Sequence, residues 1–167
     1  TYDGLNNLTG ETSPDRGALS YSYDAAGNMI TRTDARGSVH TTSYDALNRP
    51  LLKTHSHVEG IPPTADITWT YDQGDKGIGH LTQMTDESGS TVYRYDPYGR
   101  LITKTQTTTI NSTSQSHSLQ YSYDSTGRLQ QQTLPSGLQI TTRYDSQGHP
   151  SSLSLNGQPL LSAIAYQ

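Results

Sequence analysis

One short motif recurs along the whole chain and limits what the chain can fold into. Tyr-Asp is followed by two variable residues, by Gly or Asn, by one more variable residue and by an apolar residue, as in residues 23–29, 95–101 and 123–129. Weaker copies occupy residues 2–8, 44–50 and 144–150. The spacings between successive Tyr-Asp pairs are 21, 21, 27, 24, 28 and 21 residues. A period in this range predicts stacked supersecondary units rather than a conventional domain.

The repeats account for the full length of the chain. Tyr71-Asp72 is a seventh copy that reaches its Gly79-His80-Leu81 after four extra residues, and Tyr166 stands where an eighth copy would begin. We therefore expect residues 1–167 to be a single stretch of about seven units from a longer protein. The units begin near Tyr2, Tyr23, Tyr44, Tyr71, Tyr95, Tyr123 and Tyr144.

The chemistry of each motif predicts a tight turn. A carboxylate at the first position of a turn accepts backbone N–H groups, and the later Gly or Asn tolerates a positive φ. Arg49, Arg100 and Arg128 directly follow this Gly or Asn and are placed to pair with the turn Asp. The structural motif residues are Tyr23, Asp24, Gly27, Tyr44, Asp45, Asn48, Tyr71, Asp72, Gly79, Tyr95, Asp96, Gly99, Tyr123, Asp124, Gly127, Tyr144, Asp145 and Gly148.

Alternation of side chains between the turns predicts strands. Residues 19–23 alternate with a period of two, which places Tyr21 and Tyr23 on one face. Each unit then contains two strands and two turns. We expect an all-β array of antiparallel hairpins, about 14 strands in a twisted, curved sheet, with the repeat tyrosines mostly buried on one face.

These motifs resemble the RHS or YD-repeat family, which includes bacterial RHS toxins, insecticidal toxin-complex shells and teneurin-like scaffolds. Members of this family wind β-hairpins into a hollow spiral shell. The resemblance implies a structural segment of a shell that encloses a toxin or effector domain, without enzymatic activity of its own. It implies the remaining repeats and an enclosed C-terminal effector as partners, and a secreted or cell-surface location.

Composition excludes several other classes. Only 30% of the residues are hydrophobic, which leaves little material for a thick core. The net charge of −4 comes from scattered residues without a basic block, so nucleic acid is not an expected partner. No stretch is apolar enough to span a membrane, and no signal peptide begins the chain, which in a fragment says nothing about secretion.

Exposed aromatic side chains offer a second hypothesis, a carbohydrate-binding or cell-surface adhesion module. Two residues before a repeat tyrosine lie Tyr21, Trp69, Tyr93 and Tyr121, whose rings are candidates for stacking on sugars. The competing interpretation is that these rings pack adjacent hairpins together, because cross-strand aromatic pairs stabilise sheets.

Catalytic, metal and cofactor sites are not predicted. His55 and His57 share a strand face but lack a third ligand at a fixed spacing. The Asp residues recur once per repeat, as turn chemistry requires, rather than forming a catalytic pair. Processing members of the RHS family cleave at an Asp-Pro segment, but Asp96 is an ordinary repeat Asp that is followed by two more repeats.

Longer intervals between motifs predict loops or longer strands. Residues 55–65 and 73–79 are predicted loop insertions. The Thr/Ser/Gln/Asn run at 105–118 either lengthens two strands or forms a mobile loop. Asn156-Gly157 predicts a two-residue type I′ hairpin.

Overall fold

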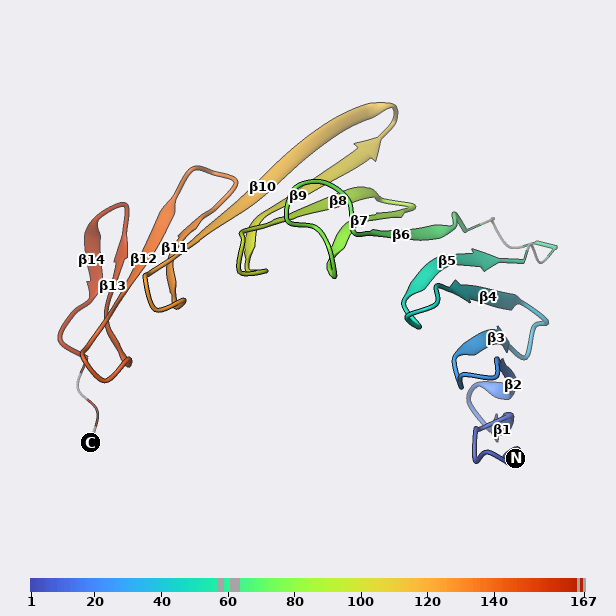
Figure 1. The fold of residues 1–167 in the computed structure, drawn as a ribbon. Coiled ribbons are helices and arrows are strands. Elements are labelled where there is room, and N and C mark those ends of the chain that lie inside the picture. The colour runs from blue at the N-terminus through green and yellow to red at the C-terminus, as the bar shows by residue number, and fades with distance from the viewer. Residues whose placement is uncertain (57–58, 61–63, 165, 167) are drawn as a thin grey trace. The chain divides into compact units, whose positions relative to one another are not determined.

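The fold is an antiparallel sheet without helices in the part of the chain that the structure describes. A computed structural model describes residues 1–56, 59–60, 64–164 and 166. Within these residues fourteen strands follow one another, and their order in the sheet is their order in the chain (Figure 1). The sheet is not closed, and the predicted all-β class is confirmed.

The chain divides into two compact units, which we describe separately. The first contains residues 1–70 and 84–88, and the second contains residues 71–83 and 89–167. The strands of the first unit are β1 (Gly10–Ser13), β2 (Gly17–Tyr23), β3 (Met29–Thr33), β4 (Val39–Tyr44), β5 (Pro50–His55) and nearly all of β6 (Ile67–Tyr71).

The second unit continues the same antiparallel pattern. Strand β7 (Leu81–Asp86) has residues in both units. The remaining strands are β8 (Gly89–Tyr95), β9 (Leu101–Ile110), β10 (Thr113–Tyr123), β11 (Leu129–Thr133), β12 (Gln139–Tyr144), β13 (Pro150–Leu155) and β14 (Gln158–Leu161). No helix forms in the described residues, so none of them belongs to a helix that could cross a membrane.

A one-residue bulge accompanies the Tyr-Asp turn in hairpin after hairpin. Between β2 and β3, Ser22 pairs with Thr31 while Tyr23 pairs with Met29, which leaves Ile30 as the extra residue. The same shift occurs beside Tyr44, Tyr95, Tyr123 and Tyr144. A bulge bends its strand and increases the local twist, so each of these hairpins contains a built-in bend.

The sheet has very little core. Among the described residues Leu19 is the one buried hydrophobic side chain, at 4% exposure, and Thr82 is the one buried polar side chain. The repeat tyrosines 23, 44, 71, 95, 123 and 144 are half-buried. Less than half of each tyrosine is exposed, which agrees with the prediction that they are mostly buried.

The predictions made for the longer intervals between motifs, and for the turn at Asn156-Gly157, can be compared with the structure where it describes these residues. The Thr/Ser-rich run extends β9 and β10, so the lengthened-strand alternative is correct and the mobile loop is wrong. Asn156 and Gly157 have φ values of 49° and 78°, which confirms the type I′ turn. Residues 57, 58 and 61–63 of the predicted loop at 55–65 lie outside the described residues.

Candidate functional site

The Tyr-Asp turns are the candidate site, because their side chains make the same contacts in successive repeats. In residues 23–29 the Asp24 Oδ1 atom accepts hydrogen bonds from the backbone N–H groups of Ala26 and Asn28, both at 2.9 Å. The Gly27 N–H donates to the Asp24 carbonyl oxygen at 3.1 Å. The same Asp hydrogen bonds recur in the turns that begin at Asp3, Asp45, Asp96, Asp124 and Asp145.

The fifth residue of the turn has the left-handed conformation that its identity predicts. Asn48 has a φ of 61°, and glycines 27, 99, 127 and 148 have φ values of 84°, 75°, 88° and 91°. The predicted positive φ is therefore present at all five positions, and each turn closes through its Asp.

Hydrogen bonding keeps the turn carboxylates ionised. The backbone N–H of Arg49 and its guanidinium lower the pKa of Asp45, against an opposing effect of desolvation. At Asp124 desolvation acts to raise the pKa, but the hydrogen bonds from Arg128 and from the Thr126 hydroxyl outweigh it and lower the pKa. Negative charge on these carboxylates therefore stabilises the turns at neutral pH.

The sixth residue of the motif reaches back to the turn carboxylate. The Nε atoms of Arg49, Arg100 and Arg128 donate to the Oδ2 atoms of Asp45, Asp96 and Asp124, each at 2.7 Å. In residues 23–29 the side-chain amide of Asn28 takes this place and donates to Asp24 Oδ2 at 2.9 Å. In the Arg-containing turns the hydrogen bond from Nε to the Asp fixes the direction of the long Arg side chain, since one end of the guanidinium is held.

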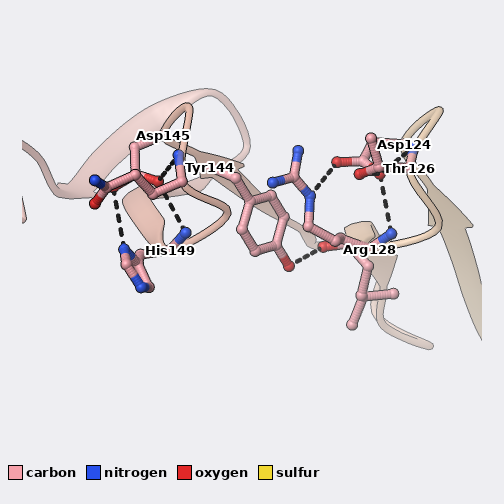
Figure 2. A network of polar contacts seen from close by, with 8 residues as sticks. Asp124, Thr126, Arg128, Tyr144, Asp145 and His149 are labelled. Atoms are coloured by element: carbon pink, nitrogen blue, oxygen red, sulfur yellow. Dashed lines mark hydrogen bonds and ion pairs between the residues drawn. The ribbon is translucent and has the colours of Figure 1, made fainter.

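The same sixth residue then packs against the tyrosine of the following repeat. The guanidinium carbon of Arg128 lies 4.4 Å from the centre of the Tyr144 ring, and that of Arg100 lies 4.6 Å from the Tyr123 ring. Histidine does the same where it replaces Arg, because the His80 ring stacks on Tyr95 with ring centres 4.3 Å apart. Figure 2 shows Arg128 between Asp124 and Tyr144. A turn is therefore linked through its sixth residue to the next repeat.

The hydroxyl of the repeat tyrosine adds a second link between repeats. Tyr144 donates to the carbonyl oxygen of Leu129, the apolar residue that ends the preceding motif, at 2.7 Å (Figure 2). This bond recurs from Tyr23 to Leu8, Tyr44 to Met29, Tyr95 to Leu81, Tyr123 to Leu101 and Tyr166 to Pro150. Each of these tyrosines thus satisfies a backbone carbonyl of its neighbour, and the rings of Tyr95, Tyr123 and Tyr144 also cover the neighbouring His or Arg.

The turn glycine leaves space for this packing. A Cβ atom on Gly127 would lie 3.3 Å from Arg100 Nη1, and one on Gly148 would lie 3.3 Å from Arg128 Nη1. On Gly99 it would lie 2.8 Å from His80 Nε2. Glycine is therefore favoured twice at these positions, by the left-handed φ and by the side chain of the preceding repeat. We use the name turn ladder for the Asp and the sixth residue of one motif together with the Tyr and the Gly of the next motif.

The residues proposed for sugar stacking lie outside the turn ladder. Tyr21, Trp69, Tyr93 and Tyr121 are half-buried, and no ring contact joins any two of them in the described part of the chain. The Tyr21 hydroxyl donates to Glu11 at 2.9 Å, as a packed side chain does.

His55 has a histidine neighbour that was not considered from the sequence. His57 lies outside the described residues, whereas His40 lies directly across the strand pair, with its Nδ1 atom 2.6 Å from Nδ1 of His55. Burial, then the neighbouring His55, Lys53 and Arg32, lower the pKa of His40. No group of three or more His, Asp or Glu side chains placed to hold a metal ion occurs in the described residues.

Comparison with known proteins identifies the repeats. A family model described as RHS Repeat matches residues 2–39, 77–114 and 118–157, which is more than half of the chain. This chain belongs to the RHS repeat family. The matched ranges include the turn-ladder motifs that begin at Asp96, Asp124 and Asp145.

Two curated relatives match the chain over 113 residues. They are the tRNA nuclease WapA of Bacillus subtilis, at 30% identity, and the tRNA3(Ser)-specific nuclease WapA of Bacillus spizizenii, at 32% identity. The match covers 62% of this chain but 5% of either relative. The chain therefore spans a small part of the length of such proteins.

Solved structures share the fold of this RHS segment. The TcdB2-TccC3-TEV crystal structure superposes with a TM-score of 0.82 at 18% identity, and it covers 98% of this chain and 9% of that chain. A Tc holotoxin pore of Photorhabdus luminescens gives the same TM-score and coverage at 17% identity. These likenesses establish the fold.

Proposed function

We propose that this chain is a wall segment of a hollow RHS shell that encloses a toxin or effector domain. The turn ladder is the observation that carries the proposal. It joins a repeat to its neighbour through surface contacts, with almost no buried core, so the number of repeats is not limited by a closed interior. Such a sheet suits a wall whose length is set by how many repeats are added.

In this proposal the chain itself carries out no chemical step. Its turn carboxylates are already occupied by backbone N–H groups and by Arg or Asn side chains, as at Asp24 and Asp124. The nuclease activity in the names of the curated relatives belongs to those whole proteins, of which this chain matches a small part. The partners are the remaining repeats of the shell and the enclosed C-terminal domain, in a secreted or cell-surface protein.

Imaging and protease protection of the full-length protein test the proposal together. Electron microscopy is expected to show a hollow shell with these repeats in its wall and density inside. A protease that digests the isolated C-terminal domain should leave it intact in the full-length protein. A solid or rod-like particle, or equal digestion in both contexts, would contradict enclosure.

Variants of the turn ladder test whether it holds the wall together. Replacing Arg128 by Ala and Tyr144 by Phe removes two links between neighbouring repeats, and the enclosed domain should then be digested faster. Arg143→Ala is the matched control, because Arg143 is an exposed residue of β12 outside the ladder. If the double variant and the control protect the domain equally, the ladder does not maintain the wall.

A further inference from the structure

The β9–β10 hairpin is longer than its neighbours and is covered unequally on its two sides. On one side β8 pairs with β9 from Tyr95 opposite Leu101 to Gly89 opposite Thr108. On the other side β11 pairs with β10 only between Gln120 and Tyr123. In Figure 1 the two strands extend together past β11. Among the described residues, 113–119 therefore have a strand partner on one side only, and we name them the open edge.

The hairpin turn determines which backbone groups of the open edge point outward. Asn111 and Ser112 form a two-residue turn with φ values of 49° and 63°, which makes the flanking Ile110–Thr113 pair a hydrogen-bonded pair. Hydrogen-bonded pairs alternate along an antiparallel ladder. The N–H and C=O groups of Ser114, Ser116 and Ser118 consequently face away from β9.

The side chains agree with this assignment. Ser114, Ser116 and Ser118 share hydrogen bonds with the hydroxyls of Thr109, Thr107 and Thr105, at 2.9, 2.8 and 2.8 Å. Side chains approach closely at the non-hydrogen-bonded pairs of an antiparallel ladder, which is where the alternation places these residues. The hydroxyl pairs also hold β10 against β9 in one register from Thr113 to Gln120.

The open edge lacks the devices that usually protect an edge strand. Residues 113–119 contain no Pro, Lys, Arg, Asp or Glu, and their pairing with β9 has no bulge. His117 is the one ionisable residue. Outside strands with free N–H and C=O groups and no such protection are templates for another strand.

We propose that the open edge binds an extended, uncharged segment of another polypeptide by β-strand addition. The segment would run antiparallel to β10 and continue the line of β11, which ends at Thr133 before the turn at 134–137. Up to six hydrogen bonds would form with the outward groups of Ser114, Ser116 and Ser118, since each offers one donor and one acceptor. Small polar or β-branched residues suit this segment, because its neighbours are Ser hydroxyls on one face and Gln115, His117 and Leu119 on the other.

Amide hydrogen exchange of the whole chain tests the edge first without a ligand. The amides of Ser114, Ser116 and Ser118 should exchange about tenfold or more faster than those of Gln115 and His117, which are bonded to β9. Equal protection of all five amides would show that the edge is not open and would overturn the proposal.

A capped synthetic peptide with the sequence of residues 105–110 is the probe for the second test. This sequence is uncharged and already forms an antiparallel partner of β10 on its other side. Adding it should slow exchange at Ser114, Ser116 and Ser118 by several-fold and leave Gln115 and His117 unchanged. Peptides that are N-methylated at alternate residues are the control, because one methylated set should abolish the effect and the other should retain it.

Two protein variants separate edge pairing from other binding. Ser116→Pro removes an outward N–H without removing a bond to β9, whereas Ser116→Ala removes the same hydroxyl and keeps the N–H. The peptide should protect the Ala variant and not the Pro variant. Equal protection of both variants, or equal effects of the two methylated peptides, would contradict strand addition. Protection that grows with protein concentration without peptide would assign the edge to a second copy instead.

Discussion

Substitutions at two turn glycines can separate the cost of the left-handed backbone from the cost of crowding the turn ladder. Gly27 and Gly99 have similar φ values of 84° and 75°. A Cβ atom on Gly27 would meet nothing within 4 Å, whereas one on Gly99 would lie 2.8 Å from His80 Nε2 and 3.1 Å from its Cε1 atom. The two sites therefore differ mainly in the presence of the preceding repeat's side chain.

The expected destabilisation follows from these two effects. Gly27→Ala should cost about 1 to 2 kcal/mol, because a left-handed conformation brings Cβ close to the following carbonyl oxygen. Gly99→Ala should cost the same amount plus about 0.5 to 1.5 kcal/mol, because His80 must move from its stacked position on Tyr95. Asn tolerates the left-handed region, so Gly27→Asn should be mild while Gly99→Asn keeps the crowding cost.

Native-state hydrogen exchange is the suitable assay, because each repeat contacts its neighbours and unfolding need not be two-state. The free energy of opening is read at the Gly27 or Gly99 amide, or at its replacement, which donates to the carbonyl oxygen of the turn Asp. Equal effects of Gly27→Asn and Gly99→Asn would show that the His80 contact does not matter. A neutral Gly27→Ala would refute the backbone argument itself.

Three further predictions concern ionisation and the tyrosine link. The pKa of Asp124 is lowered in the folded chain, so its contribution to stability should be full above about pH 4 and decline as the pH falls through the folded pKa. The free energies of unfolding of the wild type and of Asp124→Asn, measured between about pH 7 and 2, should therefore converge at low pH. The pKa of His40 is also lowered, so its protonation opposes folding, and stability should fall as the pH drops below about 6.5. His40→Gln should weaken this pH dependence in denaturant titrations at about pH 5 to 7. Tyr144→Phe should cost about 1 kcal/mol of stability, measured by hydrogen exchange, because the hydrogen bond to Leu129 is lost. Tyr98→Phe should be nearly neutral, because Tyr98 is 82% exposed. Equal effects of the two substitutions would show that the tyrosine hydroxyl does not link the repeats.

The turns could be predicted from sequence because their chemistry is local. Asp24 and Gly27 act on backbone groups within a few residues, so the motif alone indicates the hydrogen bonds and the positive φ. Antiparallel hairpins followed from the regular return of these turns. Links between repeats were not predicted, because the residue that meets Arg100 is Tyr123 and the residue that meets Arg128 is Tyr144, at unequal distances along the chain.

The pairing of His40 with His55 shows a second limit. Counting outward from Tyr44 and Pro50 in a regular hairpin would place His40 opposite Thr54, and His55 would then lie on the other face of the sheet from His40. The bulge between Ser43 and Tyr44 shifts the register by one residue and brings His55 into place. A one-residue shift exchanges the faces of a strand, so a register cannot be counted across an unrecognised bulge.

The scarcity of buried side chains has a consequence for how such a protein can evolve. In a globular domain most core positions constrain one another, because each must fill a shared volume. Here Leu19 is the one buried hydrophobic residue in the described part of the chain, so few positions are coupled through packing. Selection for the fold can then act on the motif positions and leave the strand surfaces free to drift. Such freedom lets the surfaces change for new neighbours while the backbone is kept, as the TM-score of 0.82 at 18% identity illustrates.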